Sequence, residues 1–503
     1  MKWKRRRPAL RRSGSGGGMY LGVDIGTSSV KVVLMDETQR ILGTHSEPLK
    51  LDRPQPGWSE QDPESWVAGT SAGIEAIATQ FPDQMGAVRG IGLSGQMHGA
   101  TVLDKSDRPL RPCILWNDGR AADEAAELDA DPRFRTLTGN IVFPGFTAPK
   151  IVWMERHEPK CFNRIAKVLL PKDYVRLWLS GDHASDMSDS SGTSWLDVGA
   201  RAWSDELLTA TGMSRDRMPK LFEGTAPTGR LRDILAARWK MREPVVIAGG
   251  AGDNAASACG VGTVAPGSAF VSLGTSGVIF VANERFSPNA ASAVHAFCHA
   301  LPDTWHQMGV ILSAAASLEW LAGLLGKNPA ELVALAEAED ASAGEVMFLP
   351  YLSGERTPHN DASARGSFVG LSHVTNPASL GRAVMEGVAF AFADSLAALK
   401  SAGAHVERAT AVGGGSRSSA WLQIIADALN VPIDLPADGD FGAAFGAARL
   451  GLIAAEGADP LAVCTPPVIS KTFQPNPVGA ARLGRALNRY RALHPAIKDT
   501  IIP

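Results

Sequence analysis

The sequence predicts an α/β protein built from two related domains, and three observations lead to that prediction. The chain has 503 residues, which corresponds to two or three domains at about 150 residues each. One strand–turn–strand pattern occurs twice, at residues 20–34 and 269–281, and its two Gly-Thr-Ser turns are 248 residues apart. Elsewhere short apolar runs alternate with helical patterns, as is typical of α/β domains. We therefore expect two halves with similar architecture.

The individual elements can be predicted in chain order from hydrophobic patterning and turn residues. The two β-hairpins are expected at 20–34 and 269–281, because β-branched runs flank each Gly-Thr-Ser turn. Helices are expected at 64–79, 313–325 and 380–402, short strands at 88–93, 244–248 and 409–412, and loops or edge segments at 288–302, 353–361 and 460–477. No low-complexity segment follows residue 18.

The composition is that of an ordinary globular protein and excludes several other classes. Hydrophobic residues make up 45% of the chain and charged residues 20%, unlike a disordered or fibrous chain. No apolar run approaches the roughly 18 residues that a membrane-spanning helix needs, so no membrane partner is expected. A reducing cytoplasm fits best, because the five cysteines form no C-x-x-C pair and indicate neither a disulfide framework nor a zinc ribbon; they are Cys113, Cys161, Cys259, Cys298 and Cys464.

Positive charge is concentrated at the start of the chain. The first 18 residues contain seven Lys or Arg and no acidic residue, so the remainder carries 42 basic and 52 acidic residues. A body of negative net charge repels nucleic acid and anionic membranes, so small molecules are the expected partners. Residues 1–18 lack both the aromatic-basic interleaving of a nucleic-acid arm and the apolar segment of a signal peptide. We expect them to form a disordered tail, or an upstream start ahead of Met19.

The duplicated turns are candidates for phosphate binding. Glycine lets backbone N–H groups approach an anion, and hydroxyl groups add further donors. A single turn of this kind is more often an ordinary hairpin turn, but its duplication favours two loops that hold one polyphosphate. The residues concerned are Gly26, Thr27 and Ser28 in the first turn and Gly274, Thr275 and Ser276 in the second.

Asp24 directly precedes the first turn and is a candidate for a magnesium site. A carboxylate beside phosphate is repelled unless a cation lies between them, and Mg²⁺ prefers oxygen ligands. The alternative is a solvated or capping aspartate. Lys31, further along the same hairpin, is equally well explained as an exposed strand residue or as a phosphate ligand.

A third glycine element, residues 413–419, follows an apolar strand and precedes a helix. This arrangement suits close packing of backbone against a nucleotide. The element is not G-x-G-x-x-G, and the chain contains no G-x-x-x-x-G-K-[ST] pattern, so the dinucleotide-binding and P-loop interpretations both fail.

Asp253 follows a strand and four small residues and stands where a helix is expected to begin. One interpretation is a helix N-cap. The other is a general base, because a carboxylate in a narrow cleft can accept the proton of an alcohol that attacks a γ-phosphoryl group. The sequence leaves both interpretations open.

Two polar segments, 94–99 and 114–118, follow strand-like runs and are candidates for a sugar site. Open α/β sheets bind ligands at the carboxyl ends of their strands. Taken alone, His98 is more easily explained as a structural histidine and Trp116 as a core residue. Together with Met97 and Asp118, they offer the aromatic wall and hydrogen-bonding groups that suit a neutral polyol. A zinc site at 295–299 is not favoured, because no third ligand is near and the segment fits a strand equally well.

At this point the chain resembles the FGGY carbohydrate kinases over residues 19–491. Residues 145–157, from Gly145 through Lys150 to His157, match the first family signature completely. Residues 366–371 followed by 382–386 match most of the second signature, but Ser379 stands where an acidic or amide residue is usual. The sequences of residues 95–100, 115–120 and 171–174 are similar to those of family members that act on xylulose rather than on glycerol.

The resemblance implies two actin-like (ribonuclease H-like) domains, residues 19–262 with the sugar site and 263–503 with the nucleotide site, and an active cleft between them. It implies ATP-dependent phosphorylation of D-xylulose at its 5-hydroxyl, with Mg²⁺. It assigns Asp253 as proton acceptor. The remaining implied roles are sugar contacts or their neighbours at Met97, His98, Trp116 and Asn254, phosphate contacts at 26–28 and 274–276, magnesium at Asp24, and adenosine contacts at Gly414, Gly415 and Ser418.

Other functions stay open at this stage. A kinase for another ketose or polyol, such as ribulose or arabinitol, differs only in contacts that the sequence does not place. The same fold also occurs in actin-like ATPases, and a sugar sensor without turnover is conceivable. The polar segments 94–99 and 114–118 argue against an actin-like ATPase. Asp253 argues against a sensor that performs no turnover. A homodimer is one open possibility for the assembly.

Overall fold

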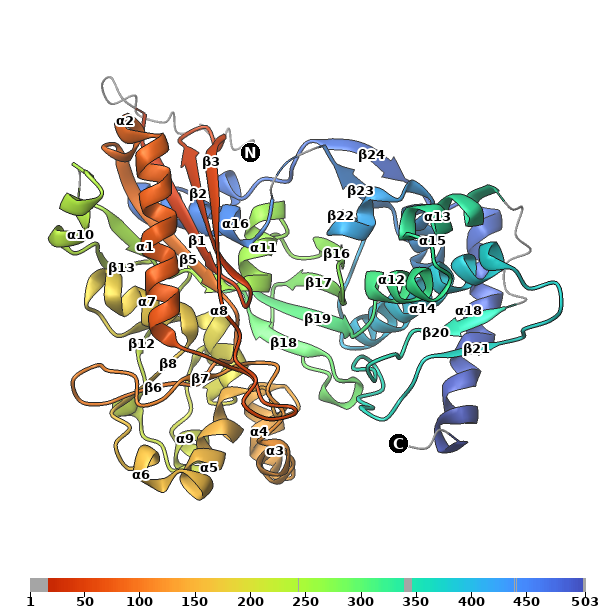
Figure 1. Ribbon diagram of the computed structural model, residues 1–503, viewed down its shortest axis with the longest axis horizontal. Coiled ribbons are helices and arrows are strands. Elements are labelled where there is room, and N and C mark those ends of the chain that lie inside the picture. Colours follow the sequence, from red (N-terminus) through yellow and green to blue (C-terminus); the bar gives the residue numbers. More distant parts are fainter. Residues whose placement is uncertain (1–16, 243, 339–345, 438, 440, 501–503) are drawn as a thin grey trace, which may run out of the picture.

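The computed structural model describes residues 17–242, 244–338, 346–437, 439 and 441–500. Almost all of the predicted tail, residues 1–16, lies outside the described residues. The described part contains two large sheets with helices packed on them, which lie side by side in Figure 1.

The first sheet has seven strands in the order β13-β14-β5-β1-β2-β3, with β15 paired to β5. The predicted hairpin is its centre, because β1 and β2 are antiparallel and their turn contains Gly26, Thr27 and Ser28. The strands are β1 Met19–Ile25, β2 Ser29–Asp36, β3 Ile41–Pro48, β5 Val88–Gly95, β13 Pro227–Arg230, β14 Val246–Ala248 and β15 Ala251–Gly252.

The second sheet has seven strands in the order β18-β19-β17-β16-β22-β23-β24. The second predicted hairpin, β16–β17, is again central. The segments predicted as loops or edge material contain the two outer strands, β18 and β24. The strands are β16 Ala269–Leu273, β17 Gly277–Asn283, β18 His295–Cys298, β19 Trp305–Ile311, β22 Ala409–Val412, β23 Ile433–Pro436 and β24 Ile469–Phe473.

The two sheets repeat one topology. In each, an antiparallel hairpin is extended by a third antiparallel strand on one side and by two parallel strands and an antiparallel edge strand on the other. Thus β3-β2-β1-β5-β14-β13 corresponds to β19-β17-β16-β22-β23-β24. The predicted α/β fold with two related domains is confirmed.

Helices cover both sheets and follow the predicted pattern. The expected helices 64–79, 313–325 and 380–402 are α1, α12 and α14. The longer helices are α1 Pro63–Gln80, α3 Ala122–Asp129, α5 Thr147–His157, α7 Pro171–Ser180, α11 Asp253–Val261, α12 Ala315–Leu324, α13 Pro329–Ala338, α14 Pro377–Ser401, α15 Ser419–Leu429, α16 Ala443–Glu456 and α18 Pro477–Ile497. The shorter ones are α2 Pro82–Met85, α4 Pro132–Thr138, α6 Pro159–Phe162, α8 Met187–Ser190, α9 Asp205–Ala210, α10 Asp233–Arg238 and α17 Pro460–Val463.

Five two-stranded pairs complete the described part of the chain. They are β4 Glu60–Gln61 with β7 Cys113–Ile114, β6 Thr101–Leu103 with β8 Lys167–Leu169, β9 Ala184–Asp186 with β12 Lys220–Phe222, β10 Leu196–Asp197 with β11 Ala202–Trp203, and β20 Met347–Leu349 with β21 Ser367–Val369. Most of them belong to the part of the first domain below its sheet in Figure 1, where helices α3 to α6 also lie.

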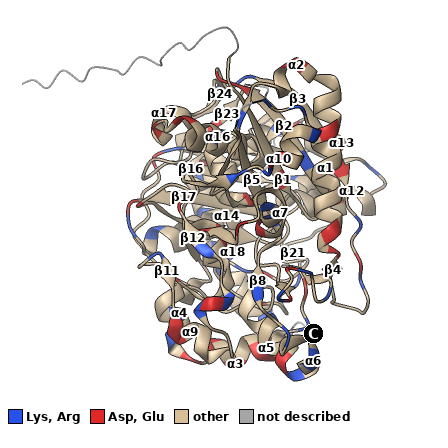
Figure 2. Cartoon of the chain, turned by 90° about the vertical axis from the view of Figure 1, so that its left-hand side faces the viewer, with Lys and Arg blue, Asp and Glu red and all other residues tan. Residues whose placement is uncertain are grey.

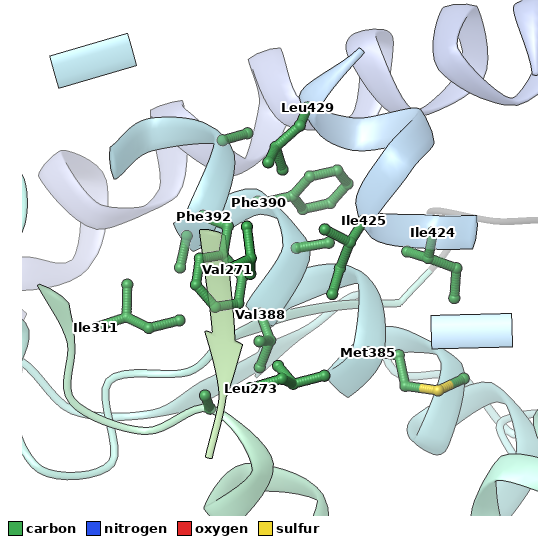
Figure 3. Packing of buried hydrophobic residues seen from close by; sticks show 14 of the residues in the cluster. Val271, Leu273, Ile311, Met385, Val388, Phe390, Phe392, Ile424, Ile425 and Leu429 are labelled. Atoms are coloured by element: carbon green, nitrogen blue, oxygen red, sulfur yellow. The ribbon is translucent and has the colours of Figure 1, made fainter. Parts of the chain in front are cut away.

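The core of the second domain forms where β16 packs on α14 and α15. Figure 3 shows Val271 and Leu273 of β16 among Val388 and Phe392 of α14 and Ile425 of α15. All five side chains are buried. Burial of such side chains contributes about 1.5–3 kcal/mol each, so this layer fixes the strand that carries the second Gly-Thr-Ser turn.

Helix α16 belongs to the second half of the sequence but packs on the first sheet, beside β1, β5 and α11. Glycines allow a backbone approach that no other residue permits. A Cβ atom at Gly22 or Gly92 would lie 1.8 Å from a carbonyl oxygen of α16, and one at Gly446 would lie 1.8 Å from the carbonyl oxygen of Ala256 in α11. The predicted division of the chain at 262/263 therefore omits this return of the chain to the first domain.

Charged residues of both signs are distributed over the exposed helices and loops of the face drawn in Figure 2. All five cysteines are free thiols, and four of them are buried. Among the described residues, no helix combines the length and the apolar character needed to cross a membrane.

We expect Gly92→Ala to destabilise the protein strongly, because the added methyl group overlaps the backbone of α16. Overpacking typically costs about 1–3 kcal/mol, and a rigid backbone neighbour places this substitution at or above the upper end. The matched control is Gly484→Ala on α18, where an added Cβ would have no neighbour within 4 Å. Urea denaturation should show a large loss for the first variant and unchanged or slightly higher stability for the second; equal stability of the two would contradict the packing described.

Candidate active site

The carboxyl ends of three neighbouring strands bring the two candidate carboxylates together. The register of β1, β5 and β15 places Asp24 beside Ser94 and Ser94 beside Ala251. In the next position Gly95 lies beside Gly252, after which Asp253 begins α11. Asp24 and Asp253, far apart in sequence, therefore lie at the same edge of the first sheet, where α/β proteins bind their ligands.

Asp253 is the first residue of α11, and the N-cap position is occupied by Gly252. The N-cap interpretation of Asp253 is therefore wrong. Its Oδ1 accepts hydrogen bonds from the backbone N (2.7 Å) and the side-chain Nδ2 (3.0 Å) of Asn254. Burial, and next the negative charge of Asp24, raise the pKa of Asp253 to about 6. A carboxylate with this pKa can hold a proton more readily than an exposed aspartate, yet is ionised at neutral pH.

The electrostatics of this edge fit a bound magnesium ion. The charge of Asp24 acts on Asp253, and two close carboxylates are stabilised by a cation between them or beside them. Mg²⁺ uses one or two carboxylates, keeps several waters and takes its other ligands from phosphate. The described residues contain no group of three or more His, Cys, Asp or Glu that could hold a metal by themselves. Lys31 lies opposite Asp24 in the hairpin register.

The first Gly-Thr-Ser turn is tied to both polar segments. The hydroxyl of Thr27 donates to Oε1 of Gln96 and accepts from Nε1 of Trp116, each at 3.0 Å. Nε2 of Gln61 donates to the carbonyl oxygen of Thr27 at 2.6 Å. Gln96 belongs to the polar segment 94–99 predicted for the sugar, whereas Gln61 was not predicted, because Thr27 is 34 residues away in sequence. Ser28 stays exposed at the tip.

Met97 and His98 form a wall next to the catalytic loop. A Cβ atom at Gly252 would lie 2.9 Å from Sδ of Met97, so this side chain contacts the residue before Asp253. His98 has a positive φ of 70° and its ring stacks on Phe146 with 4.4 Å between centroids. Its Nδ1 donates to the carbonyl oxygen of Gly192 at 2.7 Å. Burial lowers the pKa of His98 to about 3, so the ring is neutral and Nε2 is an acceptor for a hydroxyl group.

Lys150 connects the polar segments 94–99 and 114–118 through hydrogen bonds to their backbones. Its side chain is completely buried, and Nζ donates to the carbonyl oxygens of His98 (3.0 Å) and Ile114 (3.2 Å). The hydroxyl of Thr147 donates to the same carbonyl of His98. Burial lowers the pKa of Lys150 to about 7. A lysine within the apolar face of a helix is the signal that could have identified it from sequence.

The structure separates the roles of Trp116 and Asp118. Trp116 is 48% exposed, so the core interpretation is wrong and its ring is available to a ligand. Asp118 is buried, pairs with Arg120 at 2.7 Å and accepts from the backbone N of Ser59. Its acceptor capacity is already used by the protein, so the predicted sugar contact of Asp118 is not supported. It instead holds the loop that presents Trp116.

The second Gly-Thr-Ser turn lies against the third glycine element. Gly413 has a φ of +91°, and a Cβ there would lie 2.9 Å from the backbone of Leu273. The carbonyl oxygens of Gly274 and Thr275 accept hydrogen bonds from the start of α12. The side chains of Thr275 and Ser276 remain exposed. The turn is thus held from both sides while its hydroxyl groups face outward.

A cavity of about 840 Å³ lies between α11 and the loops after β22 and β23. Its lining includes Ser257, Phe270, Gly413, Arg417 and Phe441. Ser257 is one helical turn beyond Asp253, so the cavity adjoins the catalytic end of α11. Its volume is in the range of about 300–1,000 Å³ that is usual for small-molecule sites.

The predicted adenosine contacts are placed differently from one another. Gly414 is exposed and Gly415 packs close to the side chain of Leu273, whereas the cavity lining includes Gly413 and Ser416, which were not among the predicted contacts. The hydroxyl of Ser418 caps α15 by accepting from the backbone N of Trp421. The loop therefore offers a nucleotide its first glycine and Ser416 more directly than Ser418.

Arg356 of the second domain lies near His98. Arg356, in the loop predicted at 353–361, lies 4.4 Å over the ring of Phe143, and its Nη1 is 3.4 Å from Nε2 of His295. Burial, and to a smaller extent the charge of Arg356, lower the pKa values of His98 and His295. His295 belongs to strand β18, and Nε2 of His299 bonds the carbonyl oxygen of Thr263. Arg356 was not predicted from the sequence, because Phe143 belongs to the other domain and His295 is 61 residues away in the chain.

Comparison with known proteins places this site in a family. Residues 19–260 match the N-terminal domain, and residues 269–455 the C-terminal domain, of the FGGY family of carbohydrate kinases. The xylulose kinase of Escherichia coli (strain K12) is 52% identical over 439 residues, which cover 87% of this chain and 90% of that protein. The xylulose kinase of Klebsiella pneumoniae is 51% identical, with the same coverage.

Solved structures agree with the fold. A structure described as a xyloylose kinase from Brucella ovis has 60% sequence identity and a TM-score of 0.95, covering 96% of this chain and all of that one. The xylulose kinase from Rhodospirillum rubrum has 30% identity and a TM-score of 0.89, covering 96% of this chain and 99% of that one. On the domain matches, the relatives and the duplicated sheets, the chain belongs to the FGGY family of carbohydrate kinases.

Proposed function

We propose that the protein transfers the γ-phosphoryl group of ATP to the 5-hydroxyl of D-xylulose. The observation that carries this proposal is the ionisable Asp253 at an edge shared by Asp24, the sugar-side wall and the nucleotide-sized cavity. The choice of D-xylulose as the sugar is based on the relatives named xylulose kinase. A cytoplasmic location and a homodimer remain predictions.

The nucleotide is proposed to occupy the cavity beside α11. The exposed hydroxyls of Thr275 and Ser276 and the first hairpin turn would then hold its phosphates. Asp24 would hold Mg²⁺ together with those phosphates. When bound, Mg²⁺ supplies positive charge that offsets the charge developing on the transferred phosphoryl group.

The sugar is proposed to lie against Met97, His98 and the exposed ring of Trp116. The neutral His98 ring offers Nε2 as a hydrogen-bond acceptor, which suits a hydroxyl group. Asn254, through its backbone and side-chain hydrogen bonds, orients the carboxylate of Asp253. Lys150 supports this site without touching the substrate, and Asp118 holds the loop that presents Trp116.

In the reaction, the oxygen of the sugar 5-hydroxyl attacks the γ-phosphorus, and Asp253 accepts the proton of that hydroxyl. The bond between the γ-phosphorus and the β,γ-bridging oxygen breaks, and ADP leaves. Positioning and electrostatic stabilisation provide most of the acceleration in such transfers. Closure of the two domains around the ligands would exclude water from the phosphoryl group.

A substrate panel tests the proposal. The purified protein is incubated with MgATP and D-xylulose, D-ribulose, arabinitol or glycerol, or without sugar, and products are identified by mass. A pentulose phosphate formed fastest from D-xylulose is the expected result. If another polyol is preferred, the protein is a kinase with a different substrate. Release of phosphate without sugar indicates an ATPase. The absence of any product indicates a sensor.

We expect Asp253→Asn to lower kcat by about 10²- to 10⁴-fold, the usual cost of losing a general base. The amide keeps the size of the side chain, so dissociation constants for sugar and ATP and the melting temperature should stay near those of the wild type. The matched control is Asp233→Asn, which changes an exposed aspartate at the first position of helix α10. Near-normal kcat in Asp253→Asn would remove the residue from the chemistry.

The pKa of Asp253 predicts the acid limb of the pH profile. Because burial raises this pKa to about 6, the carboxylate is protonated below that pH and cannot accept a proton. We expect kcat/KM to be level above pH 7 and to fall about tenfold per pH unit below the pKa. Initial rates between pH 4.5 and 8, with melting temperatures at each pH, check this expectation; a level profile down to pH 4.5 would contradict it.

We expect Lys150→Met to raise the KM for sugar about tenfold, the order expected when a charge-assisted hydrogen bond is lost. The substitution releases the carbonyls of His98 and Ile114 without removing a group that touches substrate. Affinity for ATP should change little. Lys160→Met on α6, an exposed position, serves as control. Equal effects on sugar and ATP would show that Lys150 supports the whole fold rather than the sugar side.

A further inference from the structure

A cluster of buried charges lies beneath the catalytic loop. Nζ of Lys172 is 2.6 Å from Oδ1 of Asp173, 2.8 Å from Oδ1 of Asp186 and 3.3 Å from Oδ2 of Asp189. All four side chains have no exposed surface. Burying this many charges is costly and does not by itself stabilise a fold, so the cluster calls for a further explanation.

Ion pairs, more than hydrogen bonds, connect the members of this cluster. Arg176, whose Nε is 3.9 Å from Asp173, adds a second cation to Lys172. Burial raises the pKa of Asp189 well above its ordinary value. Among the described residues, Oδ1 of Asp186, both carboxyl oxygens of Asp189 and Nε of Arg176 have no hydrogen-bond partner. The close ion pairs between completely buried side chains restrict the motion of the cluster.

Two hydrogen bonds connect this rigid cluster to the loop before Asp253. Oδ2 of Asp186 accepts from both the backbone N and the hydroxyl of Ser188, and the hydroxyl oxygen of Ser188 accepts from the backbone N of Gly252 at 3.1 Å. At the other end of the loop, Nη2 of Arg176 donates to the carbonyl oxygen of Gly249 at 2.6 Å. The cluster therefore holds both ends of the segment 249–252.

The same cluster supports the sugar-side strand. A Cβ atom at Gly95, where β5 ends, would lie 3.1 Å from Cβ of Lys172. Gly95 is the register neighbour of Gly252. Lys172 thus lies under two adjacent strand ends, one leading to Met97 and the other to Asp253.

We propose that Ser188, anchored by Asp186 and Lys172, is a positioning residue that fixes the backbone of Gly252 and so aims the carboxylate of Asp253. This inference rests on the proposed role of Asp253 as proton acceptor. Displacement of a reacting group by about 1 Å can cost on the order of 100-fold in rate. A loss of the Ser188 contact should therefore lower kcat more than it lowers affinity.

The test compares Ser188→Ala with Ser185→Ala in the full-length protein. Ser185 belongs to the same cluster, where its hydroxyl donates to Asp173 and bonds Ser190, but among the described residues it makes no hydrogen bond to segment 249–253. Both variants lose buried hydrogen bonds and should have lower melting temperatures. We expect only Ser188→Ala to lower kcat, by about 10- to 100-fold, with sugar and ATP dissociation constants close to those of the wild type.

Normal kcat in Ser188→Ala, or an equal loss of kcat in Ser185→Ala, would overturn the inference. If Ser188→Ala cannot be purified, Ser188→Cys fills nearly the same space with a much weaker acceptor and must show the same selective loss. Asp253→Asn is measured in parallel with the sugar that the substrate panel identifies. If that variant keeps its kcat, the proposed base fails and this inference fails with it; if it loses kcat while Ser188→Ala does not, only the positioning role is wrong.

Discussion

The backbone contact of α16 with β1, β5 and α11 is the constraint on which the arrangement of the active site depends. Gly22 and Gly92 leave no side chain between the helix and the two strands, and Gly446 leaves none between α16 and α11. Arg449 of α16 completes the contact by donating to the carbonyl oxygens of Cys259 and Gly260 at the end of α11. Since Asp24 is the last residue but one of β1 and α11 begins at Asp253, this packing sets the relative positions of the two carboxylates. A helix from the second half of the sequence thereby connects the second domain to the edge of the first sheet at which Asp24 and Asp253 lie.

Several energetically unfavourable features occur at that edge, and hydrogen bonds from neighbouring groups stabilise each of them. The carboxylate of Asp253 is half-buried, and the negative charge of Asp24 acts on it. His98 adopts a left-handed backbone conformation, and Lys150 carries an ammonium group into an apolar region. Strain of this kind persists only where the surroundings determine it. Here the supports are Asn254 for Asp253, Gly192 and Lys150 for His98, and backbone carbonyls for Lys150.

Local sequence signals predicted the parts of the structure that depend on local interactions. Both hairpins, the strand at 409–412 and helices α1, α12 and α14 followed from period and turn chemistry. Asp253 was identified because small residues precede it, and Trp116 because it follows a strand. The return of α16 to the first sheet was not foreseen, since an apolar helix pattern does not specify which sheet it covers. The contacts of Gln96, Lys150, Ser188 and Arg356 were not foreseen for a related reason: their partners are 36 or more residues away in sequence. The ion pair of Asp118 with Arg120 was not foreseen, because an ion pair and a ligand contact use the same residue type; the contact of Asp118 with sugar stays a prediction.

The central claim is that the packing of α16 places Asp253 where it meets the acceptor hydroxyl and Asp24 where it meets the nucleotide phosphates. A crystal structure with D-xylulose, Mg²⁺ and a non-hydrolysable ATP analogue tests this claim most directly. The account predicts the 5-hydroxyl oxygen within hydrogen-bond distance of Asp253, about 2.6–3.2 Å, in line with the γ-phosphorus, and the metal on the Asp24 side of the phosphates. A sugar bound with its 5-hydroxyl away from Asp253, or a nucleotide bound outside the cavity beside α11, would contradict it.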